Sequence, residues 1–324
     1  MNPPTENSPA EAASVVCVGL NPAIDRVIEV RNFRPGEHQS GKEVMRSPGG
    51  KALNVSRALS ALGVANVLTG FLGAENRGEF DPLLNDPRVR DEFFSLPGRT
   101  RENVTIADPE AGQDTHIRDT GLAVSAAGLQ RLANKLKLLG GEGDMVLFSG
   151  SLPPGIGPKA FAELVAGCIQ RGARVAVDTS GNASKAVADL PLWAVKPNHR
   201  ELPALIGRSV ETPAQQLAAA GELAQRFDNV LLSCGADGAY LFRRDQALRG
   251  RLDVKPDRVR NTVGCGDAML AGFVAGIVAG RDPREAFADA LAAATASAMT
   301  FGPAQIDPEV FAELRPRVEL TSAR

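Results

Sequence analysis

The sequence lacks the marks of zinc-binding, disulfide-linked and membrane proteins. Its four cysteines, Cys17, Cys168, Cys234 and Cys265, lie far apart and form no Cys-x-x-Cys pair. This spacing favours neither a zinc site nor a disulfide framework, and it is typical of proteins of the reducing cytoplasm. No apolar run is long enough to cross a membrane, and the first residues lack the basic start and the apolar stretch of a signal peptide. We therefore expect a cytoplasmic protein.

An excess of charge of one sign is also missing. The 38 acidic and 36 basic residues are spread along the chain and leave a formal net charge of -2. Because there is no basic stripe and no polybasic patch, neither nucleic acid nor a membrane surface is an expected partner. Internal repeats and low-complexity linkers are absent as well. Small-molecule partners are favoured.

What the chain does contain is an alternation of short apolar runs and helical patterns. Runs rich in Val, Leu or Phe predict buried strands, and apolar residues at three- and four-residue spacing predict helices. The expected strands are 15–20, 67–71, 144–149, 174–178, 193–196 and 230–233, and the expected helices are 54–62, 125–139, 158–171, 200–206 and 213–227. This order predicts an α/β fold with a central, mostly parallel sheet and helices on both faces.

Two stretches, at about 21–48 and 98–121, break this alternation with short period-two patterns. They predict a small, partly exposed β-sheet built from insertions. Such a sheet could form a lid over a ligand at the carboxyl ends of the main strands, where open α/β sheets bind their ligands. We expect one domain over residues 15–315, a disordered tail over 1–14 and a C-terminal tail over 316–324.

The segment Asn261–Phe273 places a glycine-flanked acid at the start of a helix that is apolar on every face. Gly264 and Gly266 allow backbone conformations that expose N–H groups, and these groups with the helix dipole favour an incoming phosphoryl group. A carboxylate repels a phosphate, so Asp267 fits the base that accepts a proton from the attacking hydroxyl. The alternative for this segment alone is an N-terminal cap on a buried helix.

A second segment, Ser47-Pro-Gly-Gly-Lys51, leads into a helix that carries Asn54 one turn on. Two adjacent glycines let a ligand approach the main chain, and Lys51 offers a mobile cation, which suits a sugar phosphate. A Pro-Gly turn before an amphipathic helix explains the segment equally well. Asp25, just beyond the first strand, either accepts hydrogen bonds from sugar hydroxyls or is an ordinary loop residue.

Two further segments have both a functional and a structural interpretation. Asn198 and Glu201 are three residues apart at a helix start, where their oxygens suit Mg²⁺ reached through water, or where they cap the helix. The turn Ser233–Gly238 follows a strand and either borders a nucleotide or joins two strands.

The order of these segments resembles that of the ribokinase-like (PfkB-type) carbohydrate kinases over about residues 15–310. The motifs that carry the resemblance are Pro48-Gly-Gly-Lys-x-x-Asn54, Gly70-Phe-Leu-Gly73, Ser149-Gly-Ser-Leu-Pro-Pro-Gly155, Lys196-Pro-Asn-x-x-Glu201 and Thr262-Val-Gly-x-Gly-Asp267. The resemblance implies ATP-dependent phosphorylation of a sugar hydroxyl, with Asp267 as the base. The backbone of Gly264, Cys265 and Gly266 would form the anion hole; the family usually has Ala where Cys265 stands.

The resemblance also assigns residues to the two ligands. It implies sugar-phosphate contacts from Asp25, Gly49, Gly50, Lys51, Asn54, Arg101 and Asn103, and ATP contacts from Lys196, Ser233, Gly235, Gly238, Thr262 and Gly264. The resemblance also implies that Asn198 and Glu201 hold Mg²⁺ indirectly, through a bridging water. A homodimer that forms through the lid sheet is implied as well.

Within the family, the chain is similar to the 1-phosphofructokinase subfamily at Gly19-Leu-Asn-Pro-Ala-Ile-Asp25, Thr69–Asn76 and Gly98-Arg-Thr-Arg-Glu-Asn-Val104. A phosphorylated ketohexose needs cations, for which Lys51 and Arg101 are the first candidates and Arg118 and Lys42 the next.

Other activities fit parts of the same pattern. Tagatose-6-phosphate kinase and 6-phosphofructokinase share most of the signature and stay open as alternatives. A non-catalytic sugar-phosphate sensor would be expected to lose Asp267, Asn198 or Glu201, all of which are present. A Rossmann dehydrogenase would need Gly-x-Gly-x-x-Gly after the first strand, which the chain does not have.

Overall fold

The computed structural model describes residues 14–323, which form a ten-stranded sheet and a separate four-stranded sheet. The large sheet has the order β14-β13-β12-β11-β10-β9-β8-β1-β4-β5. Its strands are β1 (Val15–Gly19), β4 (Asn66–Gly73), β5 (Val89–Leu96), β8 (Met145–Ser149), β9 (Arg174–Asp178), β10 (Ala194–Val195), β11 (Asn229–Ser233), β12 (Ala239–Arg243), β13 (Gln246–Arg251) and β14 (Glu319–Ser322). All pairs from β5 to β11 are parallel, and the pairs from β11 to β14 are antiparallel. The expected mostly parallel sheet is confirmed.

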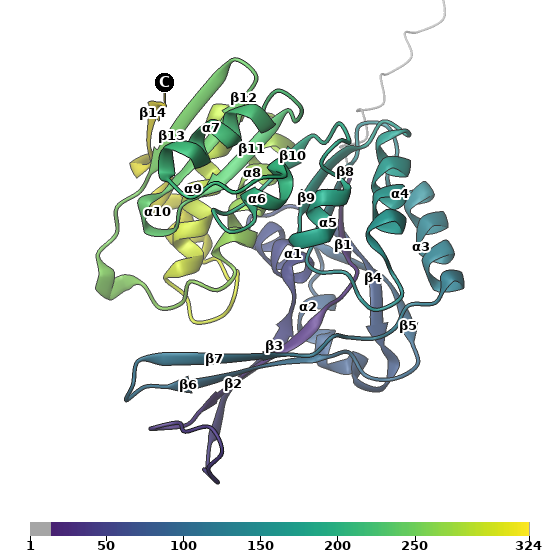
Figure 1. Ribbon diagram of the computed structural model, residues 1–324, viewed down its shortest axis with the longest axis vertical. Helices are drawn as coiled ribbons and strands as arrows, with labels where there is room; N and C mark the ends of the chain where they lie inside the picture. Colours follow the sequence, from purple (N-terminus) through teal and green to yellow (C-terminus); the bar gives the residue numbers. More distant parts are fainter. Residues whose placement is uncertain (1–13, 324) are drawn as a thin grey trace, which may run out of the picture.

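Helices cover both faces of this sheet (Figure 1). One face carries α1 (Lys51–Ala61), η1 (Ala74–Phe80), α2 (Asp81–Leu84), α8 (Cys265–Val278), α9 (Pro283–Ala298) and α10 (Pro308–Leu314), and the other carries α3 (Ala126–Leu139), α4 (Pro158–Ile169), α5 (Gly181–Ala186), α6 (Leu202–Ile206) and α7 (Pro213–Leu223). Along β1, Val15 and Cys17 pack on the first face while Val16 and Val18 pack on the second. Burial on both sides explains why this strand is a continuous apolar run.

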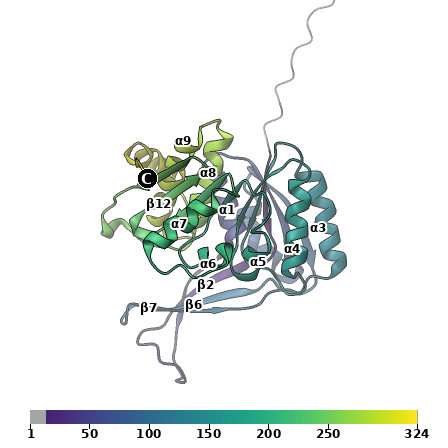
Figure 2. The same cartoon turned by 45° about the horizontal axis from the view of Figure 1, so that its top comes forward.

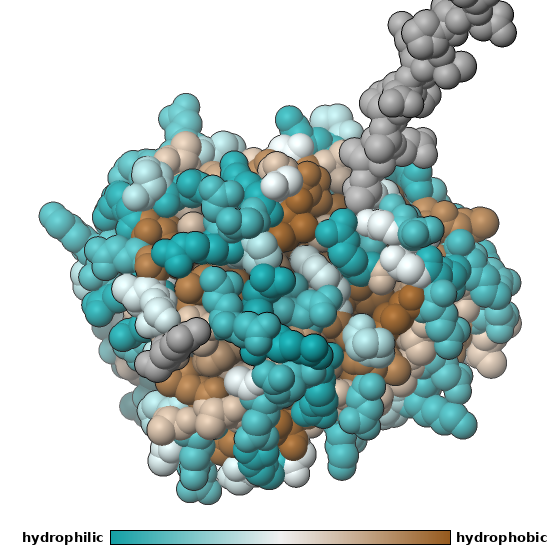
Figure 3. All heavy atoms as spheres, turned by 90° about the horizontal axis from the view of Figure 1, so that it is seen from above, coloured by the Kyte–Doolittle hydropathy of each residue, from teal (hydrophilic) through white to brown (hydrophobic). Residues whose placement is uncertain are grey.

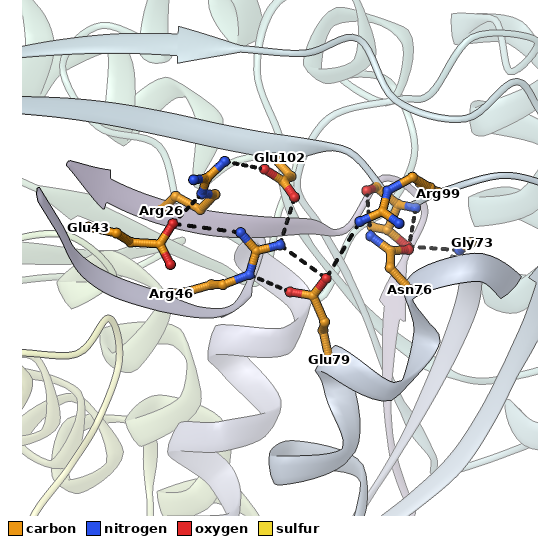
Figure 4. A network of polar contacts seen from close by, with 9 residues as sticks. Arg26, Glu43, Arg46, Gly73, Asn76, Glu79, Arg99 and Glu102 are labelled. Atoms are coloured by element: carbon orange, nitrogen blue, oxygen red, sulfur yellow. Dashed lines mark hydrogen bonds and ion pairs between the residues drawn. The ribbon is translucent and has the colours of Figure 1, made fainter. Parts of the chain in front are cut away.

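The four-stranded sheet is the expected lid. It consists of β2 (Ala23–Glu29), β3 (Lys42–Gly49), β6 (Glu102–Asp108) and β7 (Gln113–Arg118), in the order β3-β2-β6-β7. Figures 1 and 2 show it extending from one edge of the main body, below the carboxyl ends of the central strands. Ion pairs connect its base to the body: Arg46 on β3 binds Glu79 of η1 and Glu102 of β6 (Figure 4).

A tail was expected at each end of the chain, and the structure tests only the C-terminal one. Residues 1–13 of the expected N-terminal tail lie outside the described residues. The expectation of a C-terminal tail over 316–324 is wrong for β14, which pairs with β13 between Leu248↔Ser322 and Arg251↔Glu319. A four-residue strand at the sheet edge, mostly exposed, is too short to give a pattern that the sequence alone reveals.

Within residues 14–323, no helix is both long and apolar enough to cross a membrane. Figure 3 shows the face opposite the lid, where hydrophilic side chains cover most of the surface and apolar patches lie between them.

Candidate active site

Two helix N-termini meet at the carboxyl edge of the parallel strands, and each begins at a glycine that no other residue could replace without strain. Gly50 precedes α1 with φ 101°, and Gly264 precedes α8 with φ 82°. A Cβ on Gly264 would lie 2.5 Å from the backbone nitrogen of Ala304. Helices α1 and α8 pack against each other, and a hydrogen bond of 2.8 Å between Asn54 and Asp267, each in the first turn of its helix, places their positive dipole ends together. This arrangement suits the binding of anionic groups.

Asp267 lies in the first turn of α8 and is only 6% exposed. The Asn54 Nδ2 donates a hydrogen bond of 2.8 Å to Asp267 Oδ2, and Asn54 Oδ1 accepts one of 2.8 Å from Arg57 Nη1. Burial raises the pKa of Asp267 to about 7, the nearby Asp178 raises it as well, and Lys51 and Lys196 oppose this effect. A carboxyl group that titrates near neutral pH is suited to proton transfer.

Asp178, the last residue of β9, binds both lysines of the site. Its side chain is 0% exposed; Oδ1 lies 2.8 Å from Lys51 Nζ and Oδ2 lies 3.2 Å from Lys196 Nζ. Burial by itself would raise the pKa of Asp178, but Lys196 and Lys51 outweigh it and hold the pKa below its ordinary value. Asp178 was not among the site residues expected from the sequence. The available signal was an acid at the carboxyl end of a buried strand, which parallel strands direct to the ligand edge.

Lys196 follows β10 and reaches the start of α8. Its side chain is 4% exposed, and a Cβ built on Gly266 would lie 3.0 Å from Lys196 Nζ. Gly266 therefore leaves space for the ammonium beside the first N–H groups of the helix. Between these glycines, burial raises the pKa of the Cys265 thiol to about 11, so it stays protonated and acts as a small, uncharged side chain.

Three polar residues from neighbouring lid strands line the base of the lid. Asp25 on β2 pairs with Ser47 on β3 and with Asn103 on β6, and Asn103 Nδ2 donates a hydrogen bond of 2.8 Å to Asp25 Oδ1. Ser47 Oγ and Asn103 Oδ1 are buried without a hydrogen-bond partner among the described residues. Such atoms call for a partner, and sugar hydroxyls supply both donors and acceptors. Gly49 is packed against this group, because a Cβ there would lie 2.0 Å from Asp25 Oδ2.

The guanidinium of Arg101 donates hydrogen bonds to oxygens of the protein. The guanidinium donates to the carbonyl oxygens of Asn21 at 3.0 Å and Asp119 at 2.8 Å, and to Ser151 Oγ at 3.3 Å. It joins the loop after β1, the end of the lid and the loop after β8. Arg118, opposite Asn103 in the β6–β7 pair, is exposed on the same lid face. Ser151 is a second position that the sequence analysis did not single out.

Asn198 and Glu201 form a compact turn before α6. Asn198 Oδ1 accepts hydrogen bonds from the backbone nitrogens of Arg200 at 2.8 Å and Glu201 at 3.0 Å, and Glu201 Oε2 accepts one of 3.1 Å from the Asn198 nitrogen. The hydrogen bonds of a cap are therefore present. Glu201 Oε1 lies 3.2 Å from Lys51 Nζ, which places this carboxylate beside Asp178.

The donor set of this turn fits Mg²⁺ held through water. Each Glu201 oxygen makes one contact within the protein and keeps a second lone pair, which can accept a hydrogen bond from a metal-bound water. Direct coordination by several side chains fits less well, since the part of the chain that the structure describes has no group of three or more His, Cys, Asp or Glu able to hold a metal ion.

Of the residues expected near ATP, Ser233, Gly235 and Gly238 lie at the end of β11 and in the turn after it, and Thr262 lies before α8. Ser233 ends β11 and forms an isolated bridge with Asn198, and its nitrogen donates to the Pro197 carbonyl at 3.2 Å. Gly235 and Gly238 form the following turn with φ of 61° and 91°. Thr262 is exposed just before Gly264, and its carbonyl accepts a hydrogen bond of 3.4 Å from the Cys265 nitrogen.

Comparison with known proteins agrees with this geometry. A family model for pfkB family carbohydrate kinases matches residues 12–309. The chain is 38% identical over 308 residues to the 1-phosphofructokinase of Rhodobacter capsulatus, which covers 93% of this chain and 95% of that protein. It is 34% identical over 293 residues to the 1-phosphofructokinase of Haemophilus influenzae, with 90% and 93% covered.

A solved structure of a similar protein has the same fold. The crystal structure of a possible 1-phosphofructokinase from Thermotoga maritima has a TM-score of 0.79 and 27% identity, over 96% of this chain and 100% of that one. The family match spans nearly all of the described residues, and the buried Asp267, the glycine-rich start of α8 and the lid lie at one site. The chain belongs to the pfkB family of carbohydrate kinases, which transfer a phosphoryl group to an alcohol.

Proposed function

We propose that the protein is a 1-phosphofructokinase, which transfers the γ-phosphoryl group of ATP to fructose 1-phosphate and releases fructose 1,6-bisphosphate and ADP. The observation that carries this proposal is Asp267, a buried acid with a pKa of about 7 at the N-terminus of α8. The names of the relatives at 34% and 38% identity support the choice of sugar phosphate.

The sugar phosphate binds beneath the lid in this proposal. Asp25, Asn103 and Asn54 accept and donate hydrogen bonds with the ring hydroxyls, while the backbone at Gly49 and Gly50 lets the ring approach. Lys51 and Arg101 neutralise the phosphate that the substrate already carries. Four of the five N–H donors of Arg101 bind the protein, so one Nη1–H stays available for the phosphate.

Asp267 then removes the proton from the free primary hydroxyl of the sugar as its oxygen bonds to the γ-phosphorus. The bond from that phosphorus to the bridging oxygen of ADP breaks in line. The N–H groups at Gly264, Cys265 and Gly266 receive the charge of the transferring group, and Lys196 adds a full positive charge beside them. Most of the acceleration in such a transfer comes from positioning and charge neutralisation.

ATP binds along the far half of the sheet, against Lys196, Ser233, the glycine turn at Gly235 and Gly238, and Thr262, in the neighbourhood of α9. Asn198 and Glu201 would hold Mg²⁺ through its waters. When bound, the ion would neutralise charge on the phosphates.

We further propose that the enzyme acts in the cytoplasm as a homodimer that forms through the lid. Four free cysteines suit a reducing compartment. On the lid, Val44 and Ile117 are 51% and 55% exposed, which leaves apolar surface for a second copy.

A coupled assay tests the substrate. ATP consumption is measured with fructose 1-phosphate, fructose 6-phosphate, tagatose 6-phosphate and free fructose at equal concentrations. We expect fructose 1-phosphate to give the highest kcat/KM. A preference of about tenfold for another phosphorylated sugar assigns the chain to tagatose-6-phosphate kinase or 6-phosphofructokinase instead. Binding of sugar phosphate without turnover would make the protein a non-catalytic sensor.

A further inference from the structure

We propose that Asp178 is the positioning residue of this site: its buried carboxylate holds Lys51 and Lys196 on two sides of the path of the transferring phosphoryl group. This inference rests on the proposed kinase reaction and adds a role that the motifs of the sequence do not contain.

The geometry of Asp178 is that of a fixed counterion. Its backbone is part of the sheet, where it pairs with Ser149 of β8 and accepts a hydrogen bond of 2.9 Å from the Gly150 nitrogen. Its side chain is 0% exposed, so the carboxylate has no access to water that could replace its partners. Each oxygen faces one ammonium, Lys51 at 2.8 Å and Lys196 at 3.2 Å.

The two lysines need such a partner. A lysine side chain is a flexible four-carbon stem, so a fixed counterion is needed to hold its ammonium in one position. Lys196 is only 4% exposed. Burial lowers the pKa of Lys51, but Asp178 and Glu201 outweigh it and keep the pKa above its ordinary value. One carboxylate therefore holds both side chains in place.

The positions of the lysines relate them to the two phosphates. Lys196 Nζ borders Gly266 at the start of α8, where the transferring group would be held. Lys51 is the first residue of α1, directly after the glycine pair at the base of the lid. Asp178 thus links the cation on the acceptor side with the cation on the donor side.

Asp178 also acts on Asp267 through its charge. The charged groups around Asp267 are Asp178 from β9, Lys51 and Arg57 from α1, and Lys196 after β10; Cys265 on its own helix is neutral. Burial is the main cause of the raised pKa of Asp267, and Asp178 is the largest electrostatic one. Removing the Asp178 charge takes away this raising effect and should lower the pKa of Asp267.

The test is Asp178→Asn, which keeps the shape and removes the charge. Its matched control is Asp289→Asn on α9. Asp289 is also buried, at 1% exposed, and also binds two cations, Arg281 and Arg315, with Arg315 Nε at 2.8 Å. It packs against Gly276 near the far end of α8, away from the phosphate site.

We expect Asp178→Asn to lower kcat roughly tenfold or more and to move the acid limb of the kcat/KM profile down by about half a pH unit or more. Asp289→Asn should lower the thermal stability and leave the acid limb unchanged. The proposal is overturned if Asp178→Asn keeps the wild-type pH profile, whatever happens to its stability, because a purely structural role would leave the profile unmoved.

A second measurement does not depend on turnover. Thermal unfolding of the ligand-free proteins is followed from about pH 5 to 8, where the raised pKa of Asp267 makes the wild type lose stability as the pH rises. Asp178→Asn should lose less over this range, and Asp289→Asn as much as the wild type. If the wild type phosphorylates none of the sugars, the proposed function fails, and this measurement still decides whether Asp178 controls Asp267.

If Asp178→Asn does not fold, Asp178→Glu replaces it, because it keeps the charge and shifts it by one methylene. A lower kcat with the wild-type acid limb supports the positioning role. A wild-type kcat contradicts it.

Discussion

Asn54 on α1 holds Asp267 on α8 through a single hydrogen bond of 2.8 Å from Nδ2 to Oδ2. The orientation of the amide is fixed, since Arg57 donates to its oxygen at 2.8 Å and is itself bound to the carbonyls of Pro48 at 2.6 Å and Pro303 at 3.0 Å. Asp267, the proposed base, is thus connected to the glycine loop before α1 and to the loop that packs on Gly264.

Replacing Asp267 with Asn should remove the base and leave the fold intact. We expect kcat to fall on the order of 10²–10⁴-fold, because the hydroxyl keeps its proton until later in the transfer. The amide can still accept the hydrogen bond from Asn54, so the KM for the sugar phosphate should change little. Steady-state kinetics with the purified variant measure both quantities, and turnover near the wild-type level would rule out Asp267 as the base.

The raised pKa of Asp267 has consequences for both activity and stability. Only the ionised carboxylate accepts a proton, so kcat/KM should rise with pH up to an apparent pKa of about 7. Stability should change in the opposite direction. The folded-state pKa of Asp267 is above the ordinary pKa of 3.8 for this side chain, so the stabilisation is complete below pH 3.8 and is lost as the pH rises through about 7.

Asp267→Asn does not titrate and provides the control. Its advantage in the free energy of unfolding over the wild type should grow by roughly 1–4 kcal/mol between acid and neutral pH. Denaturant unfolding at several pH values measures this difference. A constant difference across the range would contradict a raised pKa.

The sequence predicted the main elements of the site because their signals are local. Gly264, Gly266 and Asp267 lie within four residues of one another, and Gly49 and Gly50 are adjacent. The first group lies at the start of the apolar helix α8, and the second lies at the start of the amphipathic helix α1. The lid was likewise visible from its period-two patterns. These features depend on backbone conformation within a few residues, which a sequence displays directly.

Other features of the site and of the fold could not be predicted, because they depend on contacts between residues that are far apart in the sequence. Lys51 and Asp178 are 127 positions apart, and only the packing of α1 against the sheet brings their charges together. Arg101 was expected to face the substrate, and its present bonds to backbone carbonyls follow from how three loops close around it. Strand β14 forms because it pairs with β13 at the edge of the sheet, and no local pattern in residues 319–322 indicates this pairing.

Gly49→Ala should weaken sugar binding through a steric effect at Asp25. The added methyl would lie 2.0 Å from Asp25 Oδ2, so the carboxylate must move away from Asn103 and from the proposed sugar-binding site at the base of the lid. We expect the KM for the sugar phosphate to rise by roughly tenfold or more, with a smaller change for ATP. Gly221→Ala on α7 is the control, because a Cβ there meets nothing within 4 Å and alanine favours the helix. Equal effects of both variants on the KM for the sugar phosphate would contradict a role for Gly49 in sugar binding.

The ion-pair network at the base of the lid should control how firmly the lid is held. Arg46 Nε and Nη2 bind Glu79 at 2.6 and 3.1 Å, and Nη2 also binds Glu102 at 2.7 Å, which ties β3 and β6 to η1 of the main body (Figure 4). These side chains are about one-third exposed or less, so salt screens them in part.

Arg46→Ala should therefore raise the KM for the sugar phosphate by roughly three- to tenfold and leave kcat at saturation nearly unchanged. The wild type should show part of the same rise at high salt, whereas the variant should respond less because the network is already broken. Arg208→Ala is the matched control: its two bonds to Glu222, at 2.9 and 2.6 Å, form an equally well-aligned pair away from the lid. Kinetics at low and high salt for the three proteins test the network, and an identical salt response in Arg46→Ala and the wild type would show that it does not hold the lid.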